Sequence, residues 1–249
     1  MTDLPLLSEP NLQQQLVEIG YQGKKLEELE GLSATEKAKM LFIVQDPYTS
    51  YYDAKVVRDF VALTQKLGFS PILLPFKPNG KAMHIKGFLA RFSKTAKTQA
   101  EFLNRVAKLN VPLVGVDPAI VLSYRDEYKE ALGDSRGDFH VLTAHEWLTN
   151  QLDSNTLQSA VKNIAKSDRT FEWHLFPHCT ESTFMPNSPK EWQYIFAQFG
   201  QTLNVEKVGC CGMAGVFGHE VQNQTMSKDI YDVSWGKKLQ GKDPNHCLA

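Results

Sequence analysis

Cysteine is absent from residues 1–178 of this 249-residue chain, and all four of its cysteines lie in the segment that follows. They are Cys179, Cys210, Cys211 and Cys247, and two of them are adjacent. In a reducing compartment, glutathione and thioredoxin disfavour structural disulfides. Clustered cysteines there more often bind a metal or take part in redox chemistry.

The sequence also lacks an excess of charge and a long apolar run. Its net charge is −1, so no global electrostatic attraction to nucleic acid is expected. No apolar run approaches the roughly 20 residues that a transmembrane helix needs. The first residues, MTDLPLLSEPNLQQQ, lack the basic, then apolar, then small-residue order of a signal peptide. We therefore expect a cytoplasmic protein without a transmembrane segment.

Short apolar segments alternate with amphipathic segments along most of the chain, which predicts an α/β fold with mainly parallel sheets. The expected strands lie within residues 40–46, 69–76, 111–117, 139–144, 172–178 and 202–209. The expected helices include residues 53–68, much of 86–109, 188–200 and 221–239. Ser188 is the predicted N-cap of its helix, and Gly200 is expected at that helix's end.

The two halves of the chain resemble one unit used twice. Gln45 ends one predicted strand and Pro78 follows the next, 33 positions later. Cys179 and Cys210 hold similar places in the second half, 31 positions apart. We therefore expect two pseudo-repeated Rossmann-like lobes, in which ligand sites collect at the carboxyl ends of the strands.

Three segments are predicted from this pattern. Residues 1–38 form a helical lead-in, residues 39–150 a cysteine-free first lobe, and residues 151–249 a second lobe that carries the cysteines.

Adjacent cysteines restrict the kind of metal site that the second lobe can form. Four thiolates can hold zinc or an iron–sulfur cluster, but zinc ligands are normally separated by two to four residues. A vicinal pair instead suits a cluster whose several irons can each take one sulfur. Gly209, Gly212 and Gly215 let the backbone approach such a cluster and direct N–H groups at its sulfurs. The alternative is that Cys210 and Cys211 are small, inert residues at a strand end.

The segment GCCGMAGVFGHE resembles the signature of cysteine-rich CCG domains, found in heterodisulfide reductase and in FAD-linked D-2-hydroxyacid dehydrogenases. LFIVQDPYTSYYDA, LLPFKPNGKAMHIKGFL, LVGVDPAIVLSYRDEY and HLFPHCTE are similar to segments of the large bacterial dehydrogenases of D-2-hydroxyglutarate or D-lactate type. The resemblance covers about residues 40–249, and in that group the first repeat has also lost its cysteines.

The resemblance implies that Cys179, Cys210 and Cys211 hold an iron–sulfur cluster of 4Fe-4S type, with Gly209 and its neighbouring glycines around it. The family's last cysteine follows a Gly-x-Ser-Cys-Arg turn, whereas this chain ends at NHCLA. Cys247 is therefore either the fourth ligand or a buried strand residue. A truncated second lobe, within a longer polypeptide, is the expectation that follows.

The implied function is electron transfer from FAD to an acceptor such as a quinone. Nothing in the chain resembles an FAD domain, so FAD, its domain and other iron–sulfur modules are expected elsewhere in the same polypeptide, and the isolated chain is expected to be inactive. A peripheral position at the inner membrane is compatible with this role. The alternative function is a non-redox structural or docking domain with zinc or no metal.

Other residues have two interpretations each. His178 and His219 are cluster ligands, donors to a sulfur, or ordinary core or surface residues. Asp46 and Asp117 face the expected crevice or, as we favour, cap the helices that follow them. Residues 77–108 contain eight Lys or Arg and one Glu, which predicts a solvated helical face or a surface for an acidic partner.

Overall fold

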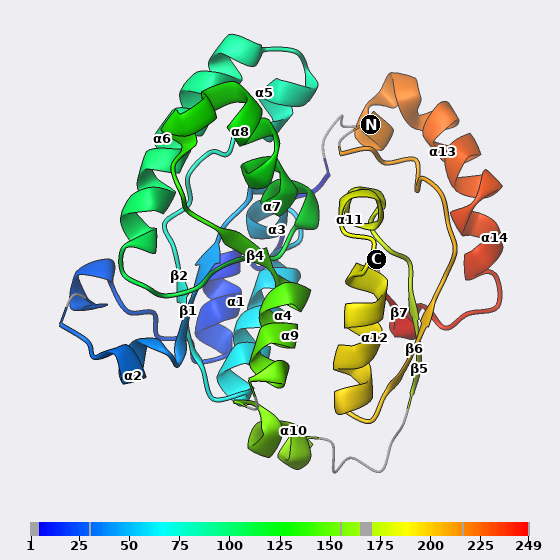
Figure 1. Ribbon diagram of the computed structural model, residues 1–249. Helices are drawn as coiled ribbons and strands as arrows, with labels where there is room; N and C mark the ends of the chain where they lie inside the picture. The colour runs from blue at the N-terminus through cyan, green and yellow to red at the C-terminus, as the bar shows by residue number, and fades with distance from the viewer. Residues whose placement is uncertain (1–4, 30, 155, 165–170, 216, 249) are drawn as a thin grey trace. The chain divides into compact units, whose positions relative to one another are not determined.

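The computed structural model describes residues 5–29, 31–154, 156–164, 171–215 and 217–248 (Figure 1). The chain divides into two compact units. The first unit is Leu7–Leu148, and the second unit is Thr149–Ala249 together with Met1–Leu6. Whether the segments predicted as 1–38, 39–150 and 151–249 fold as separate domains stays a prediction.

A four-stranded parallel sheet forms the centre of the first unit. Its strands are β1 (Met40–Val44), β2 (Ser70–Leu73), β3 (Leu113–Gly115) and β4 (Val141–Thr143), in the order β2-β1-β3-β4. All five residues of β1 are buried, because helices cover both faces of the sheet at its centre. An uninterrupted apolar run such as MLFIV is what this position requires.

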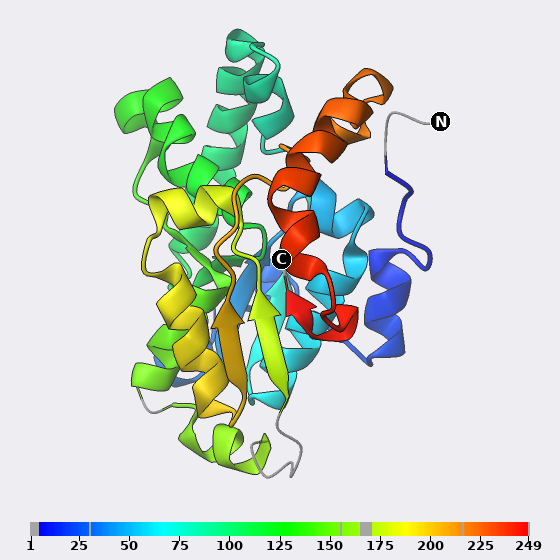
Figure 2. The same ribbon diagram turned by 90° about the vertical axis from the view of Figure 1, so that its right-hand side faces the viewer.

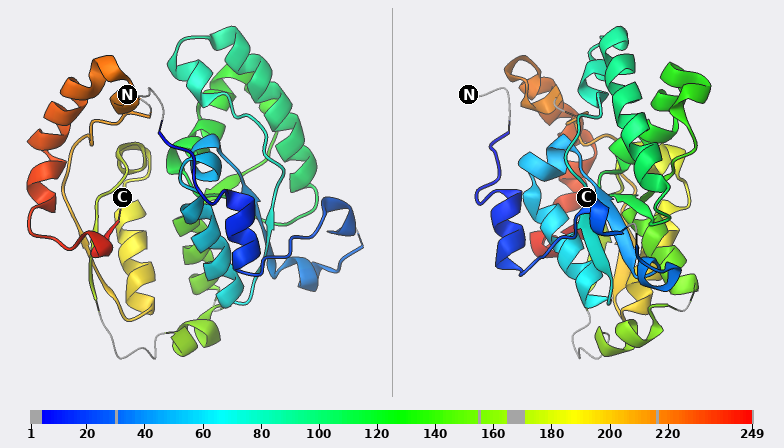
Figure 3. Two further views of the ribbon diagram at one scale, coloured as in Figure 1. Left: turned by 180° about the vertical axis from the view of Figure 1, so that it is seen from behind. Right: turned by 90° about the vertical axis from the view of Figure 1, so that its left-hand side faces the viewer.

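The helices of the first unit are α1 (Leu12–Glu18), η1 (Leu26–Leu29), α2 (Ala34–Lys37), α3 (Pro47–Tyr51), α4 (Ala54–Lys66), α5 (Lys81–Ile85), α6 (Leu89–Ala107), α7 (Pro118–Arg125), α8 (Glu127–Leu132) and η2 (Gly133–Arg136). Helix α9 (Ala144–Asp153) begins in the first unit and continues past its boundary at Leu148. Helix α1 packs beside α4 (Figure 3). The long α6 buries Phe92, Ala96 and Leu103 in the core of the unit. The hydrophobic face of α6 therefore packs in the core of the first unit.

The two Asp-Pro pairs both act as helix starts. Asp46 accepts hydrogen bonds from the N–H groups of Tyr48 and Thr49, at 2.8 and 2.9 Å, as the N-cap of α3. Asp117 accepts from Ala119 and Ile120 at 2.7 and 3.2 Å as the N-cap of α7. The capping interpretation is confirmed at both positions.

The second unit contains a three-stranded parallel sheet, seen face-on in Figure 2. Its strands are β5 (Glu172–Leu175), β6 (Thr202–Val205) and β7 (Cys247–Leu248), in the order β6-β5-β7. Its helices are α10 (Gln158–Ile164), α11 (Cys179–Phe184), α12 (Ser188–Gln198), η3 (Phe217–His219), η4 (Val221–Asn223), α13 (Gln224–Val233), α14 (Trp235–Leu239) and η5 (Pro244–His246).

The strand orders of the two units correspond. In each unit the first strand lies between the second and the third, so that β6-β5-β7 repeats the order β2-β1-β3. The predicted α/β class, with parallel sheets in two similar lobes, is confirmed. One detail of the second lobe is wrong: Ser188 is the first residue of α12 rather than its cap, and Asn187 is the N-cap. The Ser188 hydroxyl instead donates a hydrogen bond to Glu181.

Within the described part of the chain, none of the helices combines the length and the apolar character needed to cross a membrane.

The two capping aspartates of the first unit are electrostatically coupled. Burial, and then the charge of Asp117, raise the pKa of Asp46 to about 6. The Asp46 carboxyl is 2% exposed and still accepts three hydrogen bonds, which limit the shift. Because its pKa is higher in the folded state than in the unfolded chain, ionisation of Asp46 opposes folding.

We predict that Asp46→Asn flattens the pH dependence of stability. The contribution of Asp46 is fully present below an unfolded pKa of about 4 and is lost as the pH rises through about 6. The free energy of unfolding, measured by urea titration at several pH values, should therefore fall more steeply over this range in the wild type than in Asp46→Asn. The exposed substitution Asp134→Asn serves as a control. Parallel pH profiles for wild type and Asp46→Asn would contradict this prediction.

Candidate metal-binding site

The cysteines of the second unit follow two neighbouring strands. Cys179 is the first residue of α11, just after β5, and Cys210 and Cys211 follow β6. Leu175 and Val205, the last residues of β5 and β6, are partners in the parallel register. The two cysteine-bearing segments therefore leave the same edge of the sheet from adjacent strands. Cys179 and Cys210 are exposed, Cys211 is half-buried, and all are free thiols.

The side chains at this edge do not form a gathered ligand set. No three His, Cys, Asp or Glu residues in the described part of the chain are grouped closely enough to hold a metal ion. The fold thus brings the backbone segments to one edge, and the convergence of the three sulfurs stays a prediction.

Two hydrogen bonds fix the start of the cysteine loop to the helices that follow it. The Gly209 N–H donates to Ser234 Oγ at 2.7 Å, and Trp235 Nε1 donates to the Gly209 carbonyl at 3.0 Å. The Trp235 ring also lies against Phe176, with ring centroids 5.1 Å apart. The residue before Cys210 is therefore held on both of its backbone polar groups.

The glycines of the loop have specific backbone roles. Gly212 and Gly215 adopt left-handed φ angles of +87° and +69°. A Cβ on Gly212 would lie 2.2 Å from the carbonyl oxygen of Ser227 in α13. A Cβ on Gly218 would lie 2.5 Å from Ser227 Oγ. The loop backbone therefore packs directly on α13, at a distance that only glycine permits.

Several polar atoms around the cysteines suit a thiolate-bound cluster. The Gly212 N–H donates to Cys210 Sγ at 3.3 Å, which is the kind of contact that tunes ligating sulfurs in iron–sulfur proteins. His178 Nδ1 and His219 Nε2 are buried and have no hydrogen-bond partner within the described part of the chain. Buried polar atoms without a partner are uncommon, and each calls for an explanation. Soft sulfur donors, one of which accepts a backbone N–H, fit the chemistry of such a cluster.

Cys247 lies in a different position from the other three cysteines. It is the first residue of β7 and is in register with His174, inside the sheet rather than beyond its carboxyl edge. Its half-buried thiol donates to the Asp243 carbonyl at 3.4 Å. When the last register pairs of the two sheets are matched, Cys247 corresponds to Val114 of β3. Cys247 is thus a strand residue. Its role as the fourth ligand stays a prediction.

A polar cluster that the sequence did not predict lies at the segment before β7. Glu206 lies 3.0 Å from His174 Nδ1 and 2.8 Å from Lys242 Nζ. The hydrogen bond from Lys242 lowers the pKa of Glu206, burial opposes this shift, and His174 supports it. These residues come from three separate segments, and no spacing in the sequence links them. The cluster ties the exit of β6 to β5 and to the segment that leads to Cys247.

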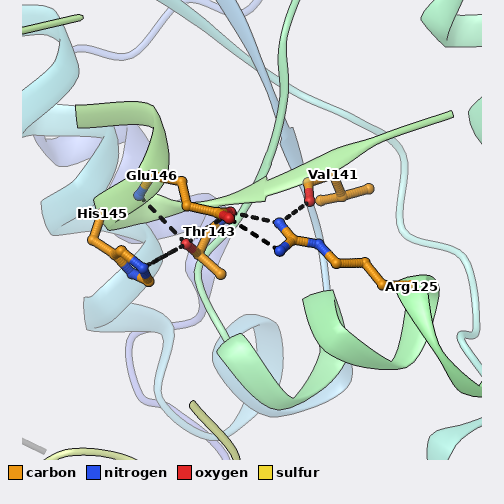
Figure 4. Close-up of polar contacts among 5 residues, drawn as sticks. All are labelled: Arg125, Val141, Thr143, His145 and Glu146. Carbon is orange, nitrogen blue, oxygen red and sulfur yellow. Dashed lines mark hydrogen bonds and ion pairs between the residues drawn. The ribbon is translucent and has the colours of Figure 1, made fainter. Parts of the chain in front are cut away.

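A second polar cluster lies at the end of β4 in the first unit (Figure 4). The Thr143 N–H donates to Glu146 Oε2 at 2.8 Å and the Glu146 N–H approaches Thr143 Oγ1 at 3.4 Å, which is a capping box for α9. Arg125 binds both Glu146 oxygens and the Val141 carbonyl. His145 is buried beside Thr143, with its Nδ1 3.1 Å from the hydroxyl. The T-x-x-E spacing was the signal that could have revealed this structural cap.

The close contact at Gly212 leads to a prediction about stability. Gly212→Ala should lower the free energy of unfolding of the second unit by about 2–4 kcal/mol, since it adds both backbone strain and a clash with the Ser227 carbonyl. Gly241→Ala is the matched control, because Gly241 has a φ of +76° but open space around its Cβ position. Urea unfolding followed by circular dichroism measures both. Equal losses in the two variants would show that the contact with Ser227 contributes nothing.

The proteins found to be similar to this chain all carry the same name. The chain is 82% identical over 249 residues to a D-2-hydroxyglutarate dehydrogenase of Haemophilus influenzae, covering 100% of this chain and 24% of that protein. It is 55% identical over the same length to the D-2-hydroxyglutarate dehydrogenase of Escherichia coli, again 24% of that protein. The Pseudomonas putida protein of the same name is 36% identical over 239 residues, 96% of this chain and 23% of that protein.

No family model and no solved structure matches the chain. The chain spans about a quarter of the length of the curated relatives that it matches, and its similarity to them extends over all or nearly all of its own length.

Proposed function

We propose that the chain is the electron-transfer part of an FAD-linked D-2-hydroxyacid dehydrogenase, with D-2-hydroxyglutarate as the substrate of the whole enzyme. The observation that carries this proposal is the similarity of the entire chain to proteins named D-2-hydroxyglutarate dehydrogenase. The cysteines that follow two adjacent strands support the proposal, because thiolates are the usual ligands of an iron–sulfur cluster.

Oxidation of a 2-hydroxyacid to a 2-oxoacid releases two electrons and two protons. An iron–sulfur cluster supplies one-electron transfer, so it suits the step that follows a two-electron flavin reaction. In this proposal FAD and further iron–sulfur modules belong to the part of the enzyme outside this chain, and the electrons pass to an acceptor such as a quinone. The chain's own residues hold the cluster and set its environment.

Cys179, Cys210 and Cys211 are the proposed cluster ligands. Gly212 directs its N–H at Cys210 Sγ, and the unpaired Nδ1 of His178 follows the same strand end as Cys179. Binding of metal to these residues would be coupled to local ordering, because the sulfurs are not gathered beforehand. A cluster of 4Fe-4S type accommodates the vicinal pair, since its separate irons can each bind one sulfur.

A second candidate is a non-redox docking domain with zinc or no metal. The absence of a gathered set of ligands in the described residues is compatible with its metal-free form. Anaerobic purification separates the two: brown colour that dithionite bleaches supports the cluster, and a colourless protein supports the docking domain.

We predict that Cys211→Ser, in the full-length enzyme purified anaerobically, removes the iron bound at this site and leaves FAD binding intact. The reason is that serine cannot replace the soft thiolate ligand. Iron and flavin content, with the visible absorption spectrum, measure the result. Cys247→Ser is the companion variant: a similar loss of iron makes Cys247 the fourth ligand, and full iron content assigns it to the strand. Unchanged iron in Cys211→Ser would refute the shared site.

The 249-residue chain alone should not oxidise D-2-hydroxyglutarate or D-lactate. It offers no recognisable flavin site to accept the hydride. The assay is reduction of a dye acceptor by the purified chain, with the full-length enzyme as the positive control. Turnover by the chain alone, comparable to that of the full-length enzyme, would contradict its assignment to electron transfer.

A further inference from the structure

The turn between α5 and α6 in the first unit exposes an unusual set of side chains. Residues 85–91 form an uninterrupted exposed run. Three of them are large and apolar: Ile85, Phe88 and Leu89 are 57%, 56% and 59% exposed. We name these three residues the apolar tip. In Figure 1 this turn is the teal segment at the top of the first unit, beyond the ends of its strands.

Hydrogen bonds hold the backbone of the turn, so the three side chains of the apolar tip have defined positions. The Gly87 N–H donates to the His84 carbonyl and the Phe88 N–H donates to the Met83 carbonyl, both at 2.9 Å. Phe92, in the next turn of α6, is buried in the core. The apolar tip therefore stands on a rigid support.

Positive charge surrounds the tip. Lys86, Arg91, Lys94 and Lys97 are all exposed. No acidic residue occurs between residues 77 and 100, and the acidic Glu127 binds the half-buried Lys81. The Arg91 guanidinium lies 5.7 Å from the centre of the Phe88 ring, so charge and apolar surface are in direct contact.

We propose that the apolar tip and its four cations dock on the surface of an anionic phospholipid membrane. Apolar side chains that enter the boundary of headgroups and acyl chains, ringed by Lys and Arg that bind anionic headgroups, are typical of proteins at the membrane surface. The rest of the apolar face of α6 packs in the core, so the turn alone enters the membrane. This inference needs neither a cluster nor the proposed electron transfer.

A protein partner fits the tip less well. A stable protein interface buries about 800 Å² on each side, and three side chains on one turn supply well under that area. Membrane attachment needs no such extended complementary surface, because each cation near an anionic surface contributes about fivefold to binding. The charged residues of the segment 77–100 are all basic, which suits an anionic lipid surface.

Sedimentation with vesicles tests the proposal on the 249-residue chain. We expect binding to phosphatidylcholine vesicles that contain about 30% phosphatidylglycerol, weakening as salt rises, and no binding to pure phosphatidylcholine. Phe88→Ser with Leu89→Ser, and separately Arg91→Glu with Lys94→Glu, should each weaken binding at least tenfold. Circular dichroism and the urea midpoint establish that the variants fold.

Matched controls are available elsewhere on the exposed surface. Val233→Ser removes an apolar side chain that is 73% exposed, and Lys66→Glu reverses an exposed charge at the end of α4. Both should bind vesicles as the wild type does. The proposal is overturned if the wild type ignores anionic vesicles, if folded tip variants still bind normally, or if the controls lose as much. Binding to immobilised poly-glutamate without vesicle binding would assign the tip to an acidic protein instead.

Discussion

Parallel pairing is the constraint on which the candidate site depends. In a parallel sheet every strand ends at the same edge, so the segments that follow neighbouring strands start next to one another. The register of Leu175 with Val205 places the exits of β5 and β6 at this edge. Residues 31 positions apart in the sequence, Cys179 and Cys210, thereby follow adjacent strands. The same pairing puts Cys247 inside the sheet, because β7 meets β5 at His174 and Leu175.

The two units use the same strand ends in different ways. In the first unit, aspartates at the ends of β1 and β3 cap helices, and their mutual repulsion is tolerated because each carboxylate accepts backbone N–H groups. In the second unit, the corresponding edge carries cysteines and a glycine-rich loop held against α13. In the first arrangement the two aspartate carboxylates find their partners within the protein. The second leaves two histidine nitrogens without a partner in the described part of the chain.

Local sequence signals predicted β1 to β6, the helices α4, α6 and α12 and the two aspartate caps, because each depends on residues close together in the chain. Apolar runs such as MLFIV and the Asp-Pro pairs are signals of this kind. The single helix expected over residues 221–239 is divided into η4, α13 and α14. Local signals could not predict the polar cluster of His174, Glu206 and Lys242, since these residues come from three distant segments. Ser188 was misassigned because its hydroxyl binds Glu181, a tertiary partner, rather than the first turn of its own helix. The positions of the sulfurs depend on long-range packing in the same way, and their convergence stays a prediction.

Trp235 lies against the backbone of the cysteine loop. Its indole N–H is hydrogen-bonded to the residue that precedes Cys210, and its ring rests on Phe176, which follows β5. The emission of this tryptophan is therefore sensitive to the path of the cysteine loop. An iron–sulfur cluster absorbs light over the range in which indoles emit, so energy transfer would quench Trp235 in proportion to occupancy. The chain thus contains a built-in optical probe, placed on the backbone that a cluster would have to order.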